Sequence, residues 1–182
     1  MPAKKKAPAV KSTPRKVGSQ KQPSPDADAG LPRPKIGDPA PGFSATATDG
    51  SMIQLADFAS KNVVLYFYPK DDTPGCTKEA CAFRDVYRQL QQKGAVVLGV
   101  SADSAKSHAK FTEKFQLPFP LLADEDRQIV RAYGAWGEKT FMGRKFFGIL
   151  RSTFLIGPDG RIRAVWPKVK PEEHAAEVLA AI

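Results

Sequence analysis

Two short apolar runs constrain the fold of this chain more than any other feature. They are "NVVLYFY" (62–68) and "GAVVLGVS" (94–101), and both lack the polar alternation of a strand with one face in water. Such runs of β-branched and aromatic residues are typical of parallel strands that are buried on both faces and joined by a helix. The stretch from about Pro74 to Lys93 has the apolar spacing of such a helix. The sequence therefore predicts a strand–helix–strand unit.

The remaining elements extend this unit into an α/β domain. The segment "GFSATATDGSMIQLADF" (42–58) predicts a short strand, a turn at Asp49-Gly50, a second strand and a brief helix. A hairpin is predicted over "RSTFLIGPDGRIRAVW" (151–166), with its turn at Pro158-Asp159-Gly160. Further helices are predicted over 103–115, within 124–134 and from Pro171 onward. This order is that of a thioredoxin-like fold, with a central mixed sheet and helices on both faces.

Charge and proline content divide the chain into two regions. Residues 1–35 carry nine Lys or Arg, two Asp and seven of the sixteen prolines, and they have almost no large apolar residue. Such a segment cannot bury enough apolar surface to offset its ordering entropy. Residues 36–182 are nearly balanced, with 19 basic and 17 acidic residues. We therefore expect a disordered basic arm over 1–35 and one folded domain over 36–182.

The arm has two interpretations. It could contact the phosphates of a nucleic acid or another anionic surface, or it could be a solubilising leader without a partner. No aromatic residue lies among its charges, so we expect no base stacking and only a weak, salt-sensitive contact. No apolar run approaches the roughly 20 residues that span a bilayer, and no apolar run follows the basic start. We expect no membrane segment and no secretory signal, hence a bacterial cytoplasm or, for a eukaryotic chain, a nucleus.

The chain's two cysteines, Cys76 and Cys81, both lie in "TPGCTKEAC" (73–81). Thr73 is suited to cap the predicted helix with its hydroxyl, and Pro74 to be the first helical residue. Cys76 is then the third helical residue, at the carboxyl end of the strand 62–68. The helix dipole and the unpaired N–H groups of the first turn favour an anion there, so we expect a partly ionised, reactive thiol.

The spacing of the two cysteines narrows what they can do together. Residues five apart in a helix have Cα atoms about 8.6 Å apart, whereas a disulfide needs about 7 Å or less. A permanent bridge would break the helix, but a redox couple could form if the first turns unwind. The pair falls short of a zinc spacing, because His108 and His174 are distant in sequence. A redox couple and a chance pair of core cysteines both remain open.

The segment "YPKDDTPGCTKEACAFRD" (68–85) resembles the active-site segment of the peroxiredoxins. The pattern Pro-x-x-x-Thr-x-x-Cys is met by Pro69, Thr73 and Cys76, and the position of Cys81 is similar to that in the bacterioferritin comigratory protein (PrxQ) subfamily. The resemblance covers roughly 36–182, including "WGEKTFMGRKFFGILRSTFLIGPDGRI" (136–162), and leaves the arm outside.

The resemblance implies roles for individual residues. Cys76 would be the peroxidatic cysteine, and Cys81 would resolve its sulfenic acid as an intramolecular disulfide. Thr73 would hydrogen-bond the thiolate and the peroxide, Pro69 would shield the pocket from water, and Arg151 matches the active-site arginine. Glu79 is usual in the helix of this subfamily, with a less defined role.

The resemblance also implies the reaction and its partners. The substrates would be hydrogen peroxide and organic hydroperoxides, and the reductant would be thioredoxin or a similar dithiol protein. Cations on the flank of the helix near Cys81, namely Lys78, Arg84 and Arg88, are the expected docking surface for that reductant. We expect no cofactor and no metal, and a monomer, because the resolving cysteine is internal.

Plainer interpretations remain for the supporting residues. Arg151 and Glu79 could be ordinary surface ion-pair partners. Three aromatic residues, Phe141, Phe146 and Phe147, could line the entrance to the site or simply pack in a loop. We expect His108, on a lysine-rich helix, to be solvated, and His174 likewise.

Two other functions remain open beside a thiol peroxidase. One is a thiol–disulfide oxidoreductase, although such enzymes use Cys-x-x-Cys and here four residues separate Cys76 from Cys81. The other is a chromatin- or nucleoid-associated binding module, for which the basic arm is the supporting feature and the folded part would be an inert scaffold.

Overall fold

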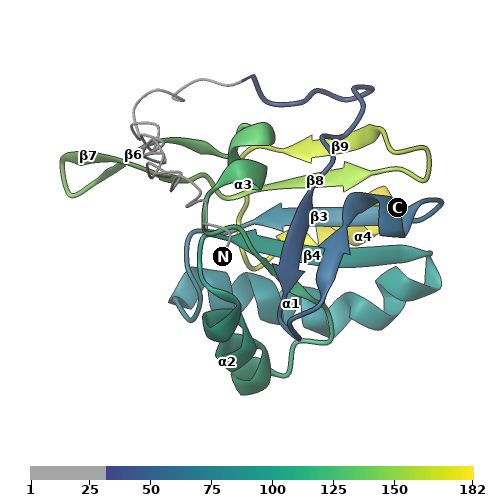
Figure 1. Cartoon of the computed structure of the whole chain (residues 1–182), viewed down its shortest axis with the longest axis horizontal. Helices are drawn as coiled ribbons and strands as arrows, with labels where there is room; N and C mark the ends of the chain where they lie inside the picture. Colours follow the sequence, from purple (N-terminus) through teal and green to yellow (C-terminus); the bar gives the residue numbers. More distant parts are fainter. Residues whose placement is uncertain (1–31) are drawn as a thin grey trace, which may run out of the picture.

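A computed structural model describes residues 32–182, which form a mixed seven-stranded sheet and a separate two-stranded hairpin (Figure 1). The strand order in the large sheet is β2-β1-β5-β4-β3-β8-β9. The elements are β1 (Ser44–Ala47), β2 (Met52–Gln54), the 3-10 helix η1 (Leu55–Phe58), β3 (Asn62–Phe67), α1 (Pro74–Gln92), β4 (Ala95–Ser101), α2 (Ala105–Phe115), β5 (Leu121–Ala123), α3 (Gln128–Ala132), β6 (Trp136–Phe141), β7 (Arg144–Ile149), β8 (Ser152–Ile156), β9 (Ile162–Trp166) and α4 (His174–Ala181).

The predicted strand–helix–strand unit is confirmed and forms the centre of the sheet. β3 and β4 are parallel and joined by α1, and β5 is parallel to β4. β8 runs antiparallel to β3 on its other side. Side chains of β3 alternate between two buried cores, one containing Val63, Leu65 and Phe67 and the other Val64 and Tyr66. A strand buried on both faces explains why its sequence is continuously apolar.

Helices cover both faces of the sheet, as the sequence predicts. Phe83 of α1, Phe111 of α2 and Val178 of α4 belong to one core. Ile129 and Val130 of α3 belong to the other core, against which η1 also packs. The hairpin of β6 and β7 projects away from the large sheet (Figure 1).

Four features differ from the sequence prediction: β5, the β6–β7 hairpin, the length of α3 and the start of α4. Neither β5 nor the β6–β7 hairpin is predicted, since β5 has three residues and the hairpin is rich in charge. The α3 helix has five residues, because Arg127 just before it adopts a left-handed conformation (φ 62°). The last helix begins at His174 and not at Pro171, because the preceding residues form a turn in which the His174 N–H donates to the Lys170 carbonyl.

Most of the basic arm lies outside the described residues, so its predicted disorder stays a prediction. The described chain begins just before Arg33, whose guanidinium donates to the Gly134 carbonyl at 3.3 Å. Within residues 32–182, no helix combines the length and apolar character needed to cross a membrane.

Candidate active site

Cys76 is the third residue of α1, as predicted, and its side chain is buried. The helix begins at Pro74, directly after the loop that follows β3, so the thiol lies at the carboxyl end of a central strand. Ala80 and Phe83 belong to the same buried core as Cys76. The sulfur therefore combines a helix N-terminus, which favours an anion, with an apolar surrounding that excludes water.

The predicted cap by the Thr73 side chain is wrong. Thr73 is the N-cap residue, but its hydroxyl makes no cap hydrogen bond and instead donates to the Lys70 carbonyl at 3.1 Å. The Thr73 carbonyl still accepts from the Thr77 N–H, so the helix starts where expected. The hydroxyl instead points toward the preceding loop, where the Lys70 carbonyl accepts its hydrogen.

Arg151 lies beside Cys76 because of the register between β3 and β8. Phe67, the last residue of β3, is paired with Ser152, the first residue of β8. Arg151 precedes Ser152 and therefore lies next to the loop that leads into α1. Its Nη2 donates to the Cys76 sulfur at 3.2 Å. The structure places this arginine at the thiol and not in a surface ion pair.

Glu79 is fully buried one turn after Cys76 and pairs with Nη1 of Arg151. The interpretation as an exposed surface pair is wrong, because the Glu79 side chain is 0% exposed and that of Arg151 is 18% exposed. Burial raises the pKa of Glu79 to about 7, although the positive charge of Arg151 opposes this shift. Burial alone would lower the pKa of Arg151, but the negative charges of Glu79 and Cys76 raise it, so the guanidinium stays charged.

Cys81 lies in the same unbroken helix as Cys76, and both thiols are free. Its side chain is half-buried, whereas Cys76 is 1% exposed. The intact helix agrees with the expectation that the two cysteines do not bond while α1 is folded. Glu79 is located between them in sequence, so any unwinding that joins the two sulfurs also displaces the partner of Arg151.

Pro69 lines two cavities next to this cluster, of about 600 and 610 Å³. Arg151 lines the first cavity, and Phe146 and Phe147 line the second, whereas Phe141 lines neither and is 69% exposed. Lys139 of β6 lines both cavities and was not singled out from the sequence. Burial and the charge of Arg151 lower the pKa of Lys139, while the charge of Cys76 opposes the shift.

Both histidines are buried, so the expectation that they are solvated is wrong. His174 lies 2.8 Å from the Thr153 hydroxyl, and His108 lies 2.9 Å from the Asp71 carboxylate. The signal for His108 was present in the sequence, because it shares a helical stripe with Phe111 and Phe115. The three lysines of α2 hid this stripe, since they made the whole helix look exposed.

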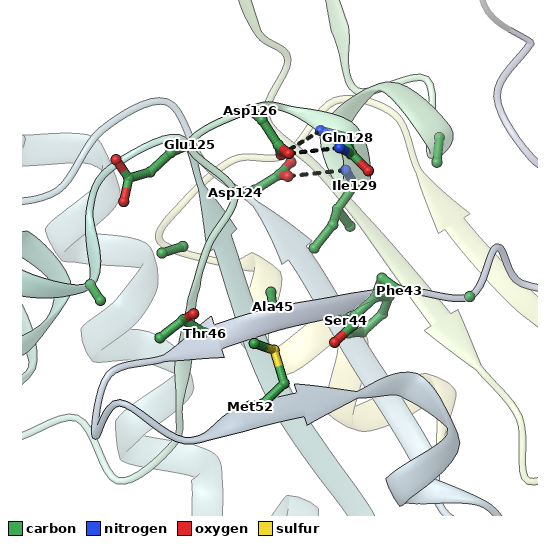
Figure 2. A pocket seen from close by; sticks show the side chains of 14 residues that line it. Phe43, Ser44, Ala45, Thr46, Met52, Asp124, Glu125, Asp126, Gln128 and Ile129 are labelled. Atoms are coloured by element: carbon green, nitrogen blue, oxygen red, sulfur yellow. Dashed lines mark hydrogen bonds between the residues drawn. The ribbon is translucent and has the colours of Figure 1, made fainter. Parts of the chain in front are cut away.

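A cavity of about 630 Å³ lies elsewhere, between β1, β5 and α3 (Figure 2). Two of the three acidic side chains that line it, Asp124 and Asp126, have partners within the protein. Asp124 accepts from the N–H groups of Ile129 and Val130 and so caps α3, and Asp126 accepts from the Gln128 side chain. Among residues 32–182, neither a cysteine nor an arginine lines this cavity, so the described residues do not repeat the chemistry of the Cys76 cluster there.

Comparisons with known proteins identify the family. The profile of the AhpC/TSA family matches residues 36–165. The peroxiredoxin Bcp of Bacillus subtilis is 45% identical over 148 residues, which cover 81% of this chain and 94% of that protein. The peroxiredoxin Bcp of Escherichia coli K12 is 46% identical over 145 residues, which cover 80% of this chain and 93% of that protein.

A solved structure supports the same assignment. A cysteine-to-serine mutant of PrxQ from Xylella fastidiosa superposes with a TM-score of 0.78 at 40% identity, covering 82% of this chain and 96% of that one. The chain therefore belongs to the AhpC/TSA family and is a thiol peroxidase of its Bcp, or PrxQ, peroxiredoxins.

Proposed function

We propose that Cys76 reduces peroxides as a thiolate that attacks one peroxide oxygen. The sulfur gains that oxygen and becomes a sulfenic acid, the O–O bond breaks, and the second oxygen takes up a proton and leaves as water or an alcohol. The observation that carries this proposal is the 3.2 Å contact between Arg151 Nη2 and the Cys76 sulfur. A guanidinium keeps its proton and stabilises the charge that spreads along S–O–O in the transition state.

Thr73 and Pro69 are proposed to place the peroxide. Because the Thr73 hydroxyl donates its hydrogen to the Lys70 carbonyl, its oxygen is left to accept a hydrogen bond from the peroxide O–H. Pro69 has no N–H and lines both cavities beside Arg151, so it covers the site without adding a competing donor. Glu79 holds the second arm of the guanidinium and thereby orients the arm that faces the sulfur.

Cys81 is the proposed resolving cysteine. Its thiol attacks the sulfenic sulfur of Cys76, a disulfide forms, and the sulfenic oxygen leaves as water. The first turns of α1 must unwind for this step, since the two positions are too far apart in an intact helix. A disulfide that holds a helix unwound is strained and exposed, which favours its reduction by an external dithiol protein.

The substrates are proposed to be hydrogen peroxide and organic hydroperoxides. The cavities at Pro69 are large enough for an organic group, and their lining is mixed apolar and cationic. The structure of the bacterioferritin comigratory protein of Xanthomonas campestris, 42% identical with a TM-score of 0.73, was described for alkyl peroxide reduction by that protein.

A thioredoxin-like protein is the proposed reductant, and the flank with Lys78, Arg84 and Arg88 is its proposed docking surface. We expect a monomer, because both reacting sulfurs belong to one chain, and a reducing bacterial cytoplasm, because the relatives named above are bacterial. A weak contact between the arm and nucleic acid is a separate proposal. Deleting residues 1–31, which spares Arg33, should leave peroxide reduction intact and abolish any salt-sensitive DNA binding.

Mass spectrometry after one equivalent of peroxide tests the proposed cycle. The wild-type chain should lose about two mass units as it forms a disulfide, and Cys81→Ser should gain about sixteen as a sulfenic acid. Cys76→Ser should not consume peroxide. If Cys76→Ser reduces peroxide at the wild-type rate, the proposal is wrong. Reduction of insulin disulfides far faster than of peroxide would instead favour a thiol–disulfide oxidoreductase.

A further inference from the structure

One buried carboxylate, that of Asp71, holds the loop between β3 and α1 in place. Asp71 lies between Pro69 and Thr73 and is 8% exposed. Its Oδ1 accepts from the Tyr68 hydroxyl at 2.7 Å, and its Oδ2 accepts from the Ser107 hydroxyl at 2.7 Å. Burial opposes ionisation of this carboxyl, but its hydrogen bonds, above all the one from His108, lower the pKa of Asp71 below its usual value.

His108 of α2 is the third side chain that contacts this carboxylate, and it also contacts β5. Nδ1 lies 2.9 Å from Asp71 Oδ2, and Nε2 lies 3.1 Å from the Leu122 carbonyl. Neither a carboxylate nor a carbonyl can donate a hydrogen bond, so this geometry places both ring nitrogens where each can act as a donor. His108 is 0% exposed, and its ring bridges the loop to β5.

Two other titratable groups, Tyr68 and Asp103, face this pair. Tyr68, directly after β3, has its hydroxyl 3.3 Å from His108 Nδ1, and burial raises the pKa of that hydroxyl. Asp103, between β4 and α2, accepts from the Asp71 N–H at 2.9 Å and from the Ser101 hydroxyl at 2.7 Å. The loop is thus held through both the backbone and the side chain of Asp71.

The next residue, Asp72, also ties the loop to α2. Asp72 has a φ of 54°, a left-handed conformation that aspartate adopts more readily than most residues other than glycine. Its carboxylate pairs with Lys114 Nζ at 2.7 Å, so two neighbouring aspartates both reach α2. The Asp72–Lys114 pair is half-exposed, so by itself it contributes little to the stability of the loop. The buried Asp71–His108 pair is the stronger of the two attachments.

We propose that His108 is a positioning residue for peroxide reduction, acting through Asp71. It holds the loop in the shape that places Pro69, Thr73 and the start of α1 around Cys76. This inference rests on the proposed function of Cys76. It adds a residue of α2, remote from the sulfur, to the machinery of the reaction.

The contact between Asp71 and His108 should matter for only one half of the catalytic cycle. Asp71 precedes Thr73 and lies outside the turns that must unwind to join Cys76 to Cys81. Attack on peroxide needs the anchored loop and the folded helix together, whereas the external dithiol acts on the unwound form. Loss of that contact should therefore slow the peroxide half of the cycle and spare the reductant half.

Steady-state kinetics of His108→Gln test this division, with His174→Gln as the matched control for loss of a buried histidine. For His108→Gln, kcat/KM for peroxide should fall about tenfold or more, since small misplacements in a site are costly, while kcat/KM for thioredoxin should change less than about twofold. His174→Gln should leave both values near wild type. If both values fall equally in His108→Gln, or neither falls in a folded variant, the positioning role is wrong.

A second variant separates the charge pair from general packing. His108→Gln leaves the Asp71 carboxylate buried without its cation, whereas Asp71→Asn with His108→Gln removes both charges and keeps hydrogen-bonding groups. The double variant should recover kcat/KM for peroxide relative to His108→Gln alone. Absence of recovery would contradict a role that works through the Asp71 charge.

Nitrogen NMR of the wild-type protein tests whether both ring nitrogens of His108 are donors, so the inference does not depend on any variant folding. The chain has two histidines, and burial lowers the pKa of His174, which should show a neutral ring near pH 7. His108 should show two protonated nitrogens in the same spectrum, and a neutral His108 ring would overturn the inference. If Cys76→Ser still reduced peroxide, the proposed function would fail instead, while the His108 signals would stand.

Discussion

Arg151 contacts the Cys76 sulfur with one arm of its guanidinium and the buried Glu79 carboxylate with the other. Cys76 and Glu79 lie one turn apart on α1. Arg151 directly precedes β8, the strand that pairs with β3 on the side away from β4. A single planar group therefore joins the nucleophile, the helix that carries it and the sheet. The site depends on the fork geometry of this side chain as well as on its charge.

Arg151→Lys should retain the positive charge and still lose most of the activity. A lysine ammonium is a compact point charge and cannot contact both the sulfur and the Glu79 carboxylate in this geometry. Removing a preorganised donor to a developing charge commonly lowers the rate constant by about 100-fold or more. We expect a fall of that order in the rate constant with hydrogen peroxide. Arg161→Lys, a surface change at a residue that donates to the Gly37 carbonyl, is the control and should react normally. Near-wild-type rates for Arg151→Lys would show that charge alone suffices.

Gly75→Ala should impair the same contact by steric displacement. A Cβ at Gly75 would lie 3.2 Å from Arg151 Nη2, so the guanidinium must shift by a few tenths of an ångström. Because alanine favours a helix more than glycine does, thermal stability should not fall. We expect peroxide reduction to slow by about three- to tenfold, as small misplacements in a site are costly. Gly42→Ala, where a Cβ meets nothing within 4 Å, should change neither property, and an unaffected Gly75→Ala rate would contradict the tight fit.

Local sequence signals predicted the parts of the site that depend on neighbouring residues. The apolar run of β3 and the Thr-Pro-Gly start of α1 place Cys76 in the first helical turn without any tertiary information. The predicted partner of the Thr73 hydroxyl was wrong, because a side chain that can cap a helix can also donate to a carbonyl of the preceding loop.

Long-range pairings could not be predicted in this way. Arg151 is 75 residues from Cys76 in sequence, and the register of β8 against β3 brings them together. The resemblance to the peroxiredoxins supplied this residue, whereas the spacing of residues did not. The burial of Glu79 and His108 was missed for a related reason: a charged residue on a charged helix looks solvated until its partner on another element is known.

Glu79→Gln should change how stability depends on pH. Burial raises the pKa of Glu79 from 4.5 to about 7, so the folded protein holds this proton at a higher pH than the unfolded chain does. The contribution of Glu79 to the free energy of unfolding is therefore largest below pH 4.5 and declines as pH rises to about 7. Relative to wild type, the variant should gain up to about 3 kcal/mol across this window. Urea unfolding at several pH values checks this, and parallel curves for the two proteins would contradict it.

Tyr66→Phe should stabilise the protein, in contrast to most changes of a buried residue. Within residues 32–182 the Tyr66 hydroxyl has no hydrogen-bond partner, and it lies where a Cβ at Gly99 would be 2.7 Å away. Removing a buried, unsatisfied hydroxyl relieves its desolvation cost, so we expect a gain of about 1 kcal/mol in the free energy of unfolding. Tyr133→Phe is the matched control, because the Tyr133 hydroxyl donates to the Pro41 carbonyl at 2.8 Å and its loss should cost about 1 kcal/mol. Urea unfolding of the reduced proteins compares the two. Equal losses would show that the Tyr66 hydroxyl has a partner, such as a buried water, in solution.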